Sequence, residues 1–142
     1  MKLCIGVIPL PEPSYSGTSS ATTYTVAKRL EDAYGLFSHF AVDNLDQMTR
    51  LLTKNIQTSL HRHIEGESEN TDTFDTAPNE ITGMFKTYLD TQALDNRESG
   101  VPTRAAMLGK RRLKGPEFRG PPRPSFEDTF TLYGSLRTWV EK

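Results

Sequence analysis

Two short clusters in this sequence contain the residue types of nucleotide and metal sites. Residues 109–112 (GKRR) are similar to the end of a phosphate-binding loop, but such a loop needs a glycine where this chain has Arg104 and a Ser or Thr where it has Arg111. His61 and His63 are two residues apart. On a helix they would point in different directions, whereas metal-binding pairs on helices are four residues apart. The first cluster does not fit a phosphate-binding loop and the second does not fit a metal site, so we expect no cofactor and no metal.

Catalytic residues are equally hard to find in the sequence. No Ser, His and Asp set and no Cys and His set stands out, and His39 is alone beside an apolar stripe. The carboxylates fall mostly on polar helix faces or in one acidic segment. We therefore expect no catalytic site and a non-enzymatic protein. Catalytic residues can still converge from distant parts of a chain, which leaves a small enzyme or an enzyme regulator as the weakest alternative.

The cluster that favours a function is basic. Residues 101–142 carry 9 Lys and Arg against 4 Asp and Glu, whereas residues 1–100 carry 8 against 14. This asymmetry indicates pairing of opposite charges, either within one molecule or with an anionic partner. We expect the basic residues to dock on an acidic neighbouring subunit; the alternative is a nucleic-acid-binding accessory protein that holds phosphates through residues 104–123. The predicted interface residues are Arg104, Lys110, Arg111, Arg112, Lys114, Arg119 and Arg123.

Length and composition limit the architecture that can position these residues. A chain of 142 residues is expected to form one domain. Cys4 is the only cysteine, so no disulfide can form within the chain. The apolar run from Leu3 to Ile8 is too short for a secretion signal, and no run approaches the roughly 20 residues of a membrane span. We expect a protein that is made in a cytoplasm and does not contact a membrane.

The hydrophobic pattern predicts a mainly helical α+β domain. Residues 2–8 and the final segment around SLRTWVE are β-prone and are natural partners for each other. A first helix is expected to have Thr22 or Thr23 as its N-cap and to be ended or kinked at Gly35. Another is expected to have Pro78 in its first turn and to bury Ile81, Met84, Phe85, Tyr88 and Leu89. Between them, apolar residues recur at steps of three and four, which predicts one amphipathic helix roughly 40 Å long. They are Phe37, Phe40, Ala41, Leu45, Met48, Leu52, Ile56, Leu60 and Ile64.

That stripe is longer than a domain of this size can cover, so we expect part of it to face another subunit. Three segments are predicted to lack regular structure because of their Pro, Gly or acidic content. They are an extended arm at residues 9–21, an acidic loop at 65–76 and a basic Pro/Gly loop at 109–124.

The C-terminal sequence PSFEDTFTLYGSLRTWV resembles the end of small virion proteins of tailed bacteriophages, the tail-completion and neck group. In that group the end reads approximately RPSFIDTGLYxxSFxAWV. The segments GVPTRAAMLGKRRLKGP and TTYTVAKRLEDAYGLFSHF are similar to two further parts of the same group. Phe130 replaces the glycine of the turn, and Gly134 is a nearby substitute. The matching residues are Arg123, Pro124, Ser125, Phe126, Asp128, Thr129, Leu132, Tyr133, Ser135, Trp139 and Val140.

The resemblance implies a structural subunit of a virion, in a neck or tail-completion ring that joins head and tail. It also implies a homo-oligomeric ring, contacts with neck, tail or connector proteins, packaged DNA nearby, and assembly in the host bacterial cytoplasm. The alternative is a structural component of the baseplate or of another part of the tail. Apart from any family, the apolar residues of this segment are expected to supply buried core. They are Phe126, Leu132, Tyr133, Leu136, Trp139 and Val140.

Overall fold

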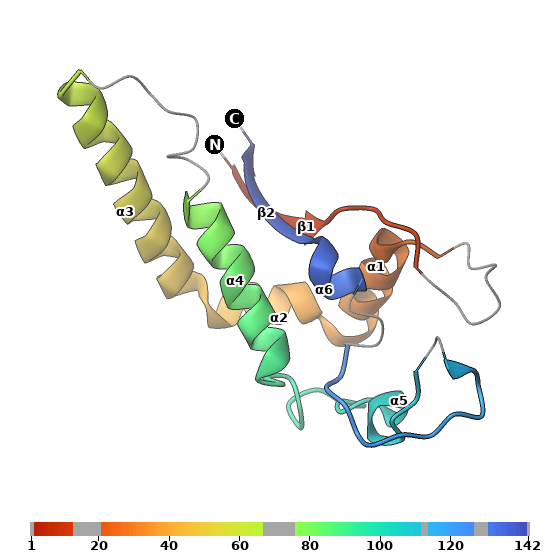
Figure 1. Cartoon of the computed structure of the whole chain (residues 1–142). Coiled ribbons are helices and arrows are strands. Elements are labelled where there is room, and N and C mark those ends of the chain that lie inside the picture. Colours follow the sequence, from red (N-terminus) through yellow and green to blue (C-terminus); the bar gives the residue numbers. More distant parts are fainter. Residues whose placement is uncertain (1, 13–20, 67–75, 112–113, 127–130, 142) are drawn as a thin grey trace.

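The computed structural model describes residues 2–12, 21–66, 76–111, 114–126 and 131–141 (Figure 1). It confirms a mainly helical α+β domain with one long helix and a small sheet formed by the two ends of the chain. Parts of the predicted arm (13–20) and acidic loop (67–75), together with Arg112, Asp128 and Thr129, lie outside the described residues. The elements in order are β1 (Lys2–Val7), α1 (Thr23–Tyr34), α2 (Leu36–Asp43), α3 (Leu45–Ile64), α4 (Thr76–Asp90), α5 (Arg104–Met107), α6 (Thr131–Ser135) and β2 (Leu136–Glu141).

The predicted pairing of the two chain ends is confirmed. β1 and β2 are antiparallel, with Lys2 opposite Glu141 and Val7 opposite Leu136. Side chains alternate between the two faces of a strand, so one face of this sheet packs on α4, where Thr82 donates a hydrogen bond to Thr138 (Oγ1 to Oγ1, 3.1 Å). The other face of the sheet lies toward α1.

Aromatic stacking between α2 and α4 forms the centre of the core. The ring of Phe85 stacks on Phe40, with centroids 4.4 Å apart, and meets Phe37 edge-on at 5.0 Å. Phe40, Ile81 and Phe85 are almost fully buried. The predicted buried face of α4 is therefore confirmed, and α4 joins the first half of the chain to the C-terminal strand.

The ends of α1 also agree with the sequence-based expectation. Thr22 caps the helix by accepting a hydrogen bond from the backbone N–H of Thr25 at 3.3 Å. Gly35 ends it in the left-handed conformation, with φ of 58°, which glycine adopts without steric cost. Glu31 then caps the next helix, because its Oε2 accepts the backbone N–H of Phe37 at 2.7 Å.

The prediction of one continuous helix over residues 37–64 is wrong. The chain forms α2 and α3, which meet at Asn44, where φ is −113° and ψ is 10°. The Asn44 side-chain amide donates to the carbonyl of Phe40 at 2.9 Å. Asparagine competes in this way with the backbone hydrogen bonds of a helix. The apolar repeat continues through this junction and therefore did not reveal it.

The two described ends of the segment predicted as an extended arm lie side by side. The backbone N–H of Glu12 donates to Ala21 at 2.9 Å, and that of Thr23 donates to Leu10 at 2.8 Å. The Thr23 hydroxyl, which is fully buried, donates to the carbonyl of Ile8 at 2.5 Å. The described ends of the segment are thus fixed against each other at the start of α1.

Candidate interaction surfaces

The basic loop folds tightly on itself after α5. Gly109 is buried and left-handed, with φ of 59°. A Cβ atom at this position would lie 2.2 Å from the carbonyl oxygen of Gly120. Only glycine therefore allows the backbone at 109 to approach the backbone at 120 this closely. The Pro and Gly content that predicted irregular structure therefore builds a defined loop.

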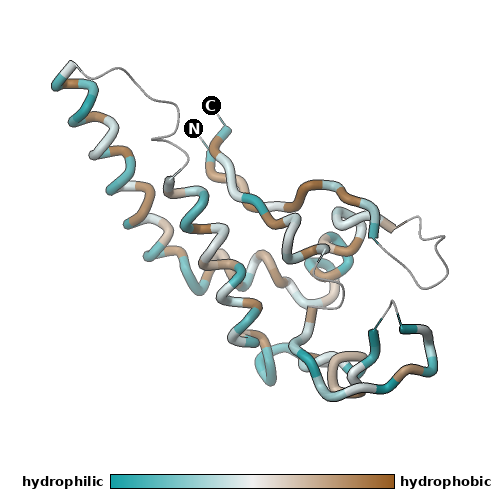
Figure 2. The backbone as a smooth tube through the Cα atoms, in the orientation of Figure 1, coloured by the Kyte–Doolittle hydropathy of each residue, from teal (hydrophilic) through white to brown (hydrophobic). Residues whose placement is uncertain are grey.

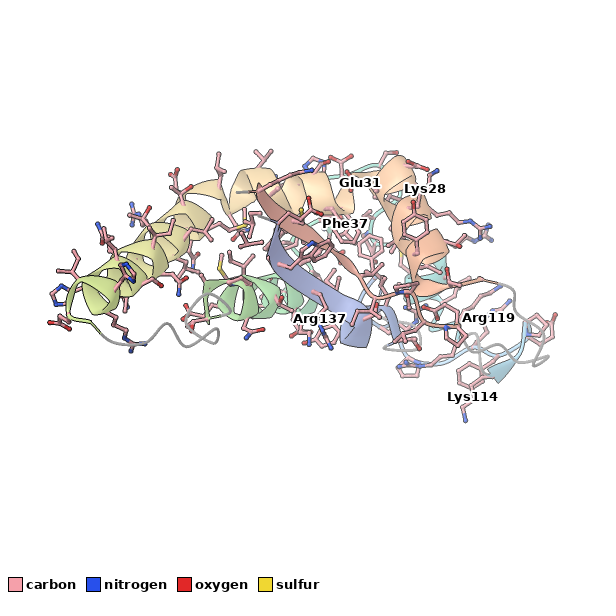
Figure 3. The ribbon with its side chains drawn as sticks, turned by 90° about the horizontal axis from the view of Figure 1, so that it is seen from above. Lys28, Glu31, Phe37, Lys114, Arg119 and Arg137 are labelled. Atoms are coloured by element: carbon pink, nitrogen blue, oxygen red, sulfur yellow. The ribbon has the colours of Figure 1, made fainter. Side chains whose placement is uncertain are left out.

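Some of the predicted interface cations hold this loop together. The guanidinium of Arg123 donates through Nε to the carbonyl of Lys110 at 2.9 Å, and Arg119 donates through Nη1 to the carbonyls of Pro116 and Phe118, both at 2.9 Å. Arg104 and Lys114 are exposed, and Lys114 points away from the body of the protein (Figure 3). The loop thus presents charge outward from a scaffold that its own arginines stabilise.

The three segments that carry the phage resemblance meet in space. The buried Ser125 hydroxyl accepts the backbone N–H of Thr103 at 3.0 Å, which ties the RPSF segment to the GVPT segment. The ring of Phe126 lies 5.5 Å from that of Tyr34, at the end of α1. Phe126 has a φ of 73°, a conformation that costs a non-glycine residue about 1–3 kcal/mol. The sequence located a turn near here but did not show which residue takes the left-handed conformation.

The remaining described motif residues build the entry to β2. The Ser135 hydroxyl is buried and donates to the carbonyl of Leu132 at 2.7 Å. Tyr133 donates to Asp90 at 3.1 Å, while Pro124 continues the backbone that Arg123 anchors. Residues 131–135 form the short helix α6, so the final strand starts only at Leu136.

The expectation that Trp139 and Val140 belong to the buried core is wrong: Trp139 is 42% exposed and Val140 is half-buried. Trp139 lies on the sheet face opposite α4, across from Cys4 in the register. Its ring lies over Gly6, where a Cβ atom would be 3.0 Å from the ring. The indole thus uses the space that glycine leaves and remains open to solvent.

Beside Trp139 is a hollow of about 490 Å³ between the sheet and α1. Its walls are mostly apolar, and three aromatic residues, Tyr24, Phe37 and Trp139, come from three different elements. Lys28, Glu31 and Asp32 add a net charge of −1 on the α1 side; Figure 3 shows Lys28 and Glu31 on this helix, near Phe37. This site could not be predicted from the sequence, because the register of β1 and β2 and the packing of α1 on β1 together place Trp139 beside α1.

A second apolar surface lies on the part of α3 that extends past the start of α4 (Figure 1). Hydrophobic positions continue along this part of the helix (Figure 2). Met48, in the first half of α3, is buried, but Ile56, Leu60 and Ile64 are 47%, 57% and 74% exposed. We call these last three residues the α3 ridge. The prediction that the domain cannot cover the whole stripe is confirmed.

The electrostatic centre of the molecule is a network around Asp43 at the end of α2. Arg97 donates to both oxygens of Asp43, at 2.5 and 3.2 Å, and Tyr88 donates to Oδ2 at 2.8 Å. The Arg97 hydrogen bond, helped by that of Tyr88, lowers the pKa of Asp43 to about 2. Burial, together with the bond to Asp43, raises the pKa of Tyr88 to about 12. These groups join α2, α4 and the turn that follows α4, so we assign them a structural role.

The histidines are placed mainly beside carboxylates. The Nε2 atom of His39 lies 2.8 Å from Oε1 of Glu98, and the Nε2 atom of His61 lies 3.2 Å from Oε1 of Glu65. Within the described ranges, no group of three or more His, Cys, Asp or Glu side chains could hold a metal ion. Among the helices described, none has the length and apolar character needed to cross a membrane.

Comparisons of the chain with models of known protein families, with curated proteins and with solved structures gave no match. The surfaces that its own residues form are therefore the basis for a functional assignment.

Proposed function

We propose that this chain is a non-enzymatic structural subunit of a tailed-phage virion, in a neck or tail-completion ring that joins head and tail. The observation that carries the proposal is the α3 ridge, because it turns three large aliphatic side chains away from the domain that should bury them. Contiguous exposed apolar surface on a small protein marks a contact with another macromolecule. The protein is thus built for association.

The phage assignment is supported by the arrangement of the resembling segments. Ser125 accepts a hydrogen bond from Thr103, and the ring of Phe126 contacts that of Tyr34. These two contacts involve residues from all three of the resembling segments. These contacts bring the three segments into one packed unit. A shared local structure would explain why these residues occur together in this chain and in the phage proteins that it resembles.

The basic loop adds a second surface for the same role. Lys114 and Arg104 are exposed, and residues 101–142 carry a charge of +5 whereas residues 1–100 carry −6. Copies of such a chain can attract one another with opposite charges when they assemble. In this role the loop docks on the acidic surface of a neighbouring virion subunit.

The direct test of the proposal is the composition of purified phage particles. We expect mass spectrometry of particles from the phage that carries this gene to find the chain at a small, fixed copy number relative to the major capsid protein. An amber mutation in the gene should give filled heads and free tails that do not join. Particles that are infective and complete without the chain would contradict the proposal.

The basic loop gives a separate test of docking against DNA binding. The Lys110→Glu, Lys114→Glu double variant should stay folded and should fail to complement the amber mutant. The isolated wild-type protein should bind duplex DNA weakly. Tight duplex binding that falls steeply with salt, as expected when phosphate contacts release counterions, would instead favour a nucleic-acid-binding accessory protein.

A further inference from the structure

The α3 ridge is built so that its own domain cannot cover it. Four residues of an α-helix turn through about 400°, so each step of four moves a side chain about 40° around the axis. From Met48 apolar residues recur in steps of four, at positions 52, 56, 60 and 64, and Leu51 is the one further apolar residue in this range. Their exposure rises accordingly, from 4% at Met48 to 74% at Ile64. The apolar stripe therefore winds from the inward to the outward face of the helix.

The inward face of the same part of α3 is polar. Asn55 and Ser59 are half-buried there, while Ile56 and Leu60 beside them are exposed. The buried hydroxyl oxygen of Ser59 has no hydrogen-bond partner among the residues that the structure describes, although a buried polar atom without a partner costs stability. A helix optimised only for its own domain would have the opposite arrangement. The outer half of α3 is thus amphipathic with respect to an external partner.

The hollow beside Trp139 has the complementary shape and chemistry. The ridge is convex and aliphatic, whereas the hollow is concave, about 490 Å³ in volume and lined by Tyr24, Phe37 and Trp139. The charges also complement each other. The helix α3 contains three Lys and Arg residues against one acidic residue, Asp46, and the side chains of the hollow have a net charge of −1.

The two surfaces cannot meet within one molecule. The outer end of α3 projects to one side of the body, and α1 lies on the other side (Figure 1). The ridge belongs to a continuous helix, and the hollow is formed by the packed sheet and α1, so neither can fold over to reach the other. Only a second copy can bring them together.

We propose that the α3 ridge of one copy docks in the hollow beside Trp139 of the next copy. This proposal rests on the proposed virion role, since it names the subunit contact of that assembly. The contact uses two different surfaces, so every copy that joins leaves one ridge and one hollow free. Such head-to-tail contacts produce rings when the rotation closes and filaments when it does not.

The test uses one variant on each surface and a matched control. Leu60→Lys places a charge on the ridge, Tyr24→Lys places one at the rim of the hollow, and both sites are exposed. Leu45→Lys is the control, because Leu45 lies on the same helix and is 60% exposed, against 57% for Leu60. Sedimentation velocity of the full chain measures association, and circular dichroism checks the fold. If Tyr24→Lys does not fold, Asp32→Lys replaces it.

We expect the wild type and Leu45→Lys to form oligomers and each test variant alone to associate at least about 30-fold more weakly, the effect typical of a central contact. Mixed in equal amounts, the two test variants should form a one-to-one dimer and nothing larger, because Leu60→Lys still has an intact hollow and Tyr24→Lys an intact ridge. Isologous pairing of ridges would leave Tyr24→Lys fully associated and would overturn the proposal. So would a mixture that stays monomeric.

Failure of this contact and failure of the virion role give different results. If both variants associate like the wild type, or if the wild type is a monomer at every concentration, the ridge-to-hollow contact is wrong. The virion role is then decided separately by whether purified particles contain the chain.

Discussion

The two halves of α3 have the same apolar repeat and opposite positions in the structure. In the inner half Met48 is buried against the core, and in the outer half Ile64 is largely exposed. The difference arises because a step of four residues exceeds one helical turn, so the stripe rotates as it advances. A regular apolar repeat therefore shows that a helix has an apolar face, but it does not show that one partner covers that face along its whole length.

This comparison separates stability from assembly. The inner half of α3 packs with α2 and α4 around Phe40 and Phe85, and its side chains should contribute to the free energy of unfolding. The outer half should contribute little to the stability of a single copy and much to contacts between copies. Four comparisons test this division between the packed body and the exposed surfaces, beginning with the largest expected effect.

Replacement of Phe85 by alanine should cost about 3–5 kcal/mol of the free energy of unfolding, because the buried ring is lost and a cavity remains. Phe85 contacts both Phe37 and Phe40, so the loss affects the joint between α2 and α4. Urea denaturation measures the effect. Tyr24→Ala is the control, since Tyr24 is exposed and its loss should change stability by less than about 0.5 kcal/mol. Equal effects of the two substitutions would contradict the location of the core.

The direct comparison of the two halves is Met48→Ala against Leu60→Ala. We expect the first to cost about 2–5 kcal/mol and the second to lie within about 0.5 kcal/mol of the wild type. Denaturation should be measured at a concentration where the protein is monomeric, so that loss of association does not contribute. A large cost for Leu60→Ala under those conditions would mean that the domain itself covers the outer half.

A polar contact in the body should matter more than one on the outer half. Ser125→Ala leaves the backbone N–H of Thr103 without its partner at a partly buried site, which should cost about 1–3 kcal/mol. In contrast, Thr58 in the outer half donates to the carbonyl of Lys54 at an exposed site, and Thr58→Ala should change stability by less than about 0.5 kcal/mol. Thermal unfolding of the two variants gives the comparison. If Ser125→Ala is as stable as Thr58→Ala, the hydrogen bond between Ser125 and Thr103 does not stabilise the fold.

The smallest expected effect is a dependence of stability on acid. The pKa of Asp43 is lowered from 3.8 to about 2 by its hydrogen bonds with Arg97 and Tyr88, so the charged form is favoured in the folded protein. This contribution is complete above about pH 4 and is lost as the pH falls through 2. The free energy of unfolding should fall over this range by more in the wild type than in Asp43→Asn. Identical profiles for the two proteins would exclude a role for this network in stability.

Local signals in the sequence were enough for most of the elements. The cap at Thr22, the glycine at the end of α1 and the inward positions of α4 follow from neighbouring residues, because helix ends and periodicity are local properties. The pairing of the chain ends was also predictable, since two β-prone segments at the termini are natural partners. The α3 ridge was expected as an excess of apolar surface, although its exact residues were not.

Tertiary structure alone decided the break at Asn44, the positive φ of Phe126 and the position of Trp139. The apolar segment that contains Trp139 predicts a buried indole. Only the register of β1 and β2 places this indole over Gly6 and beside α1. The hollow likewise requires residues from α1, α2 and the sheet to converge. The sequence by itself determined the positions of α1, α4 and the two terminal strands, and that apolar surface is in excess. Which apolar side chains remain exposed depends on how the elements pack, because burial is a property of the whole arrangement and not of any one segment.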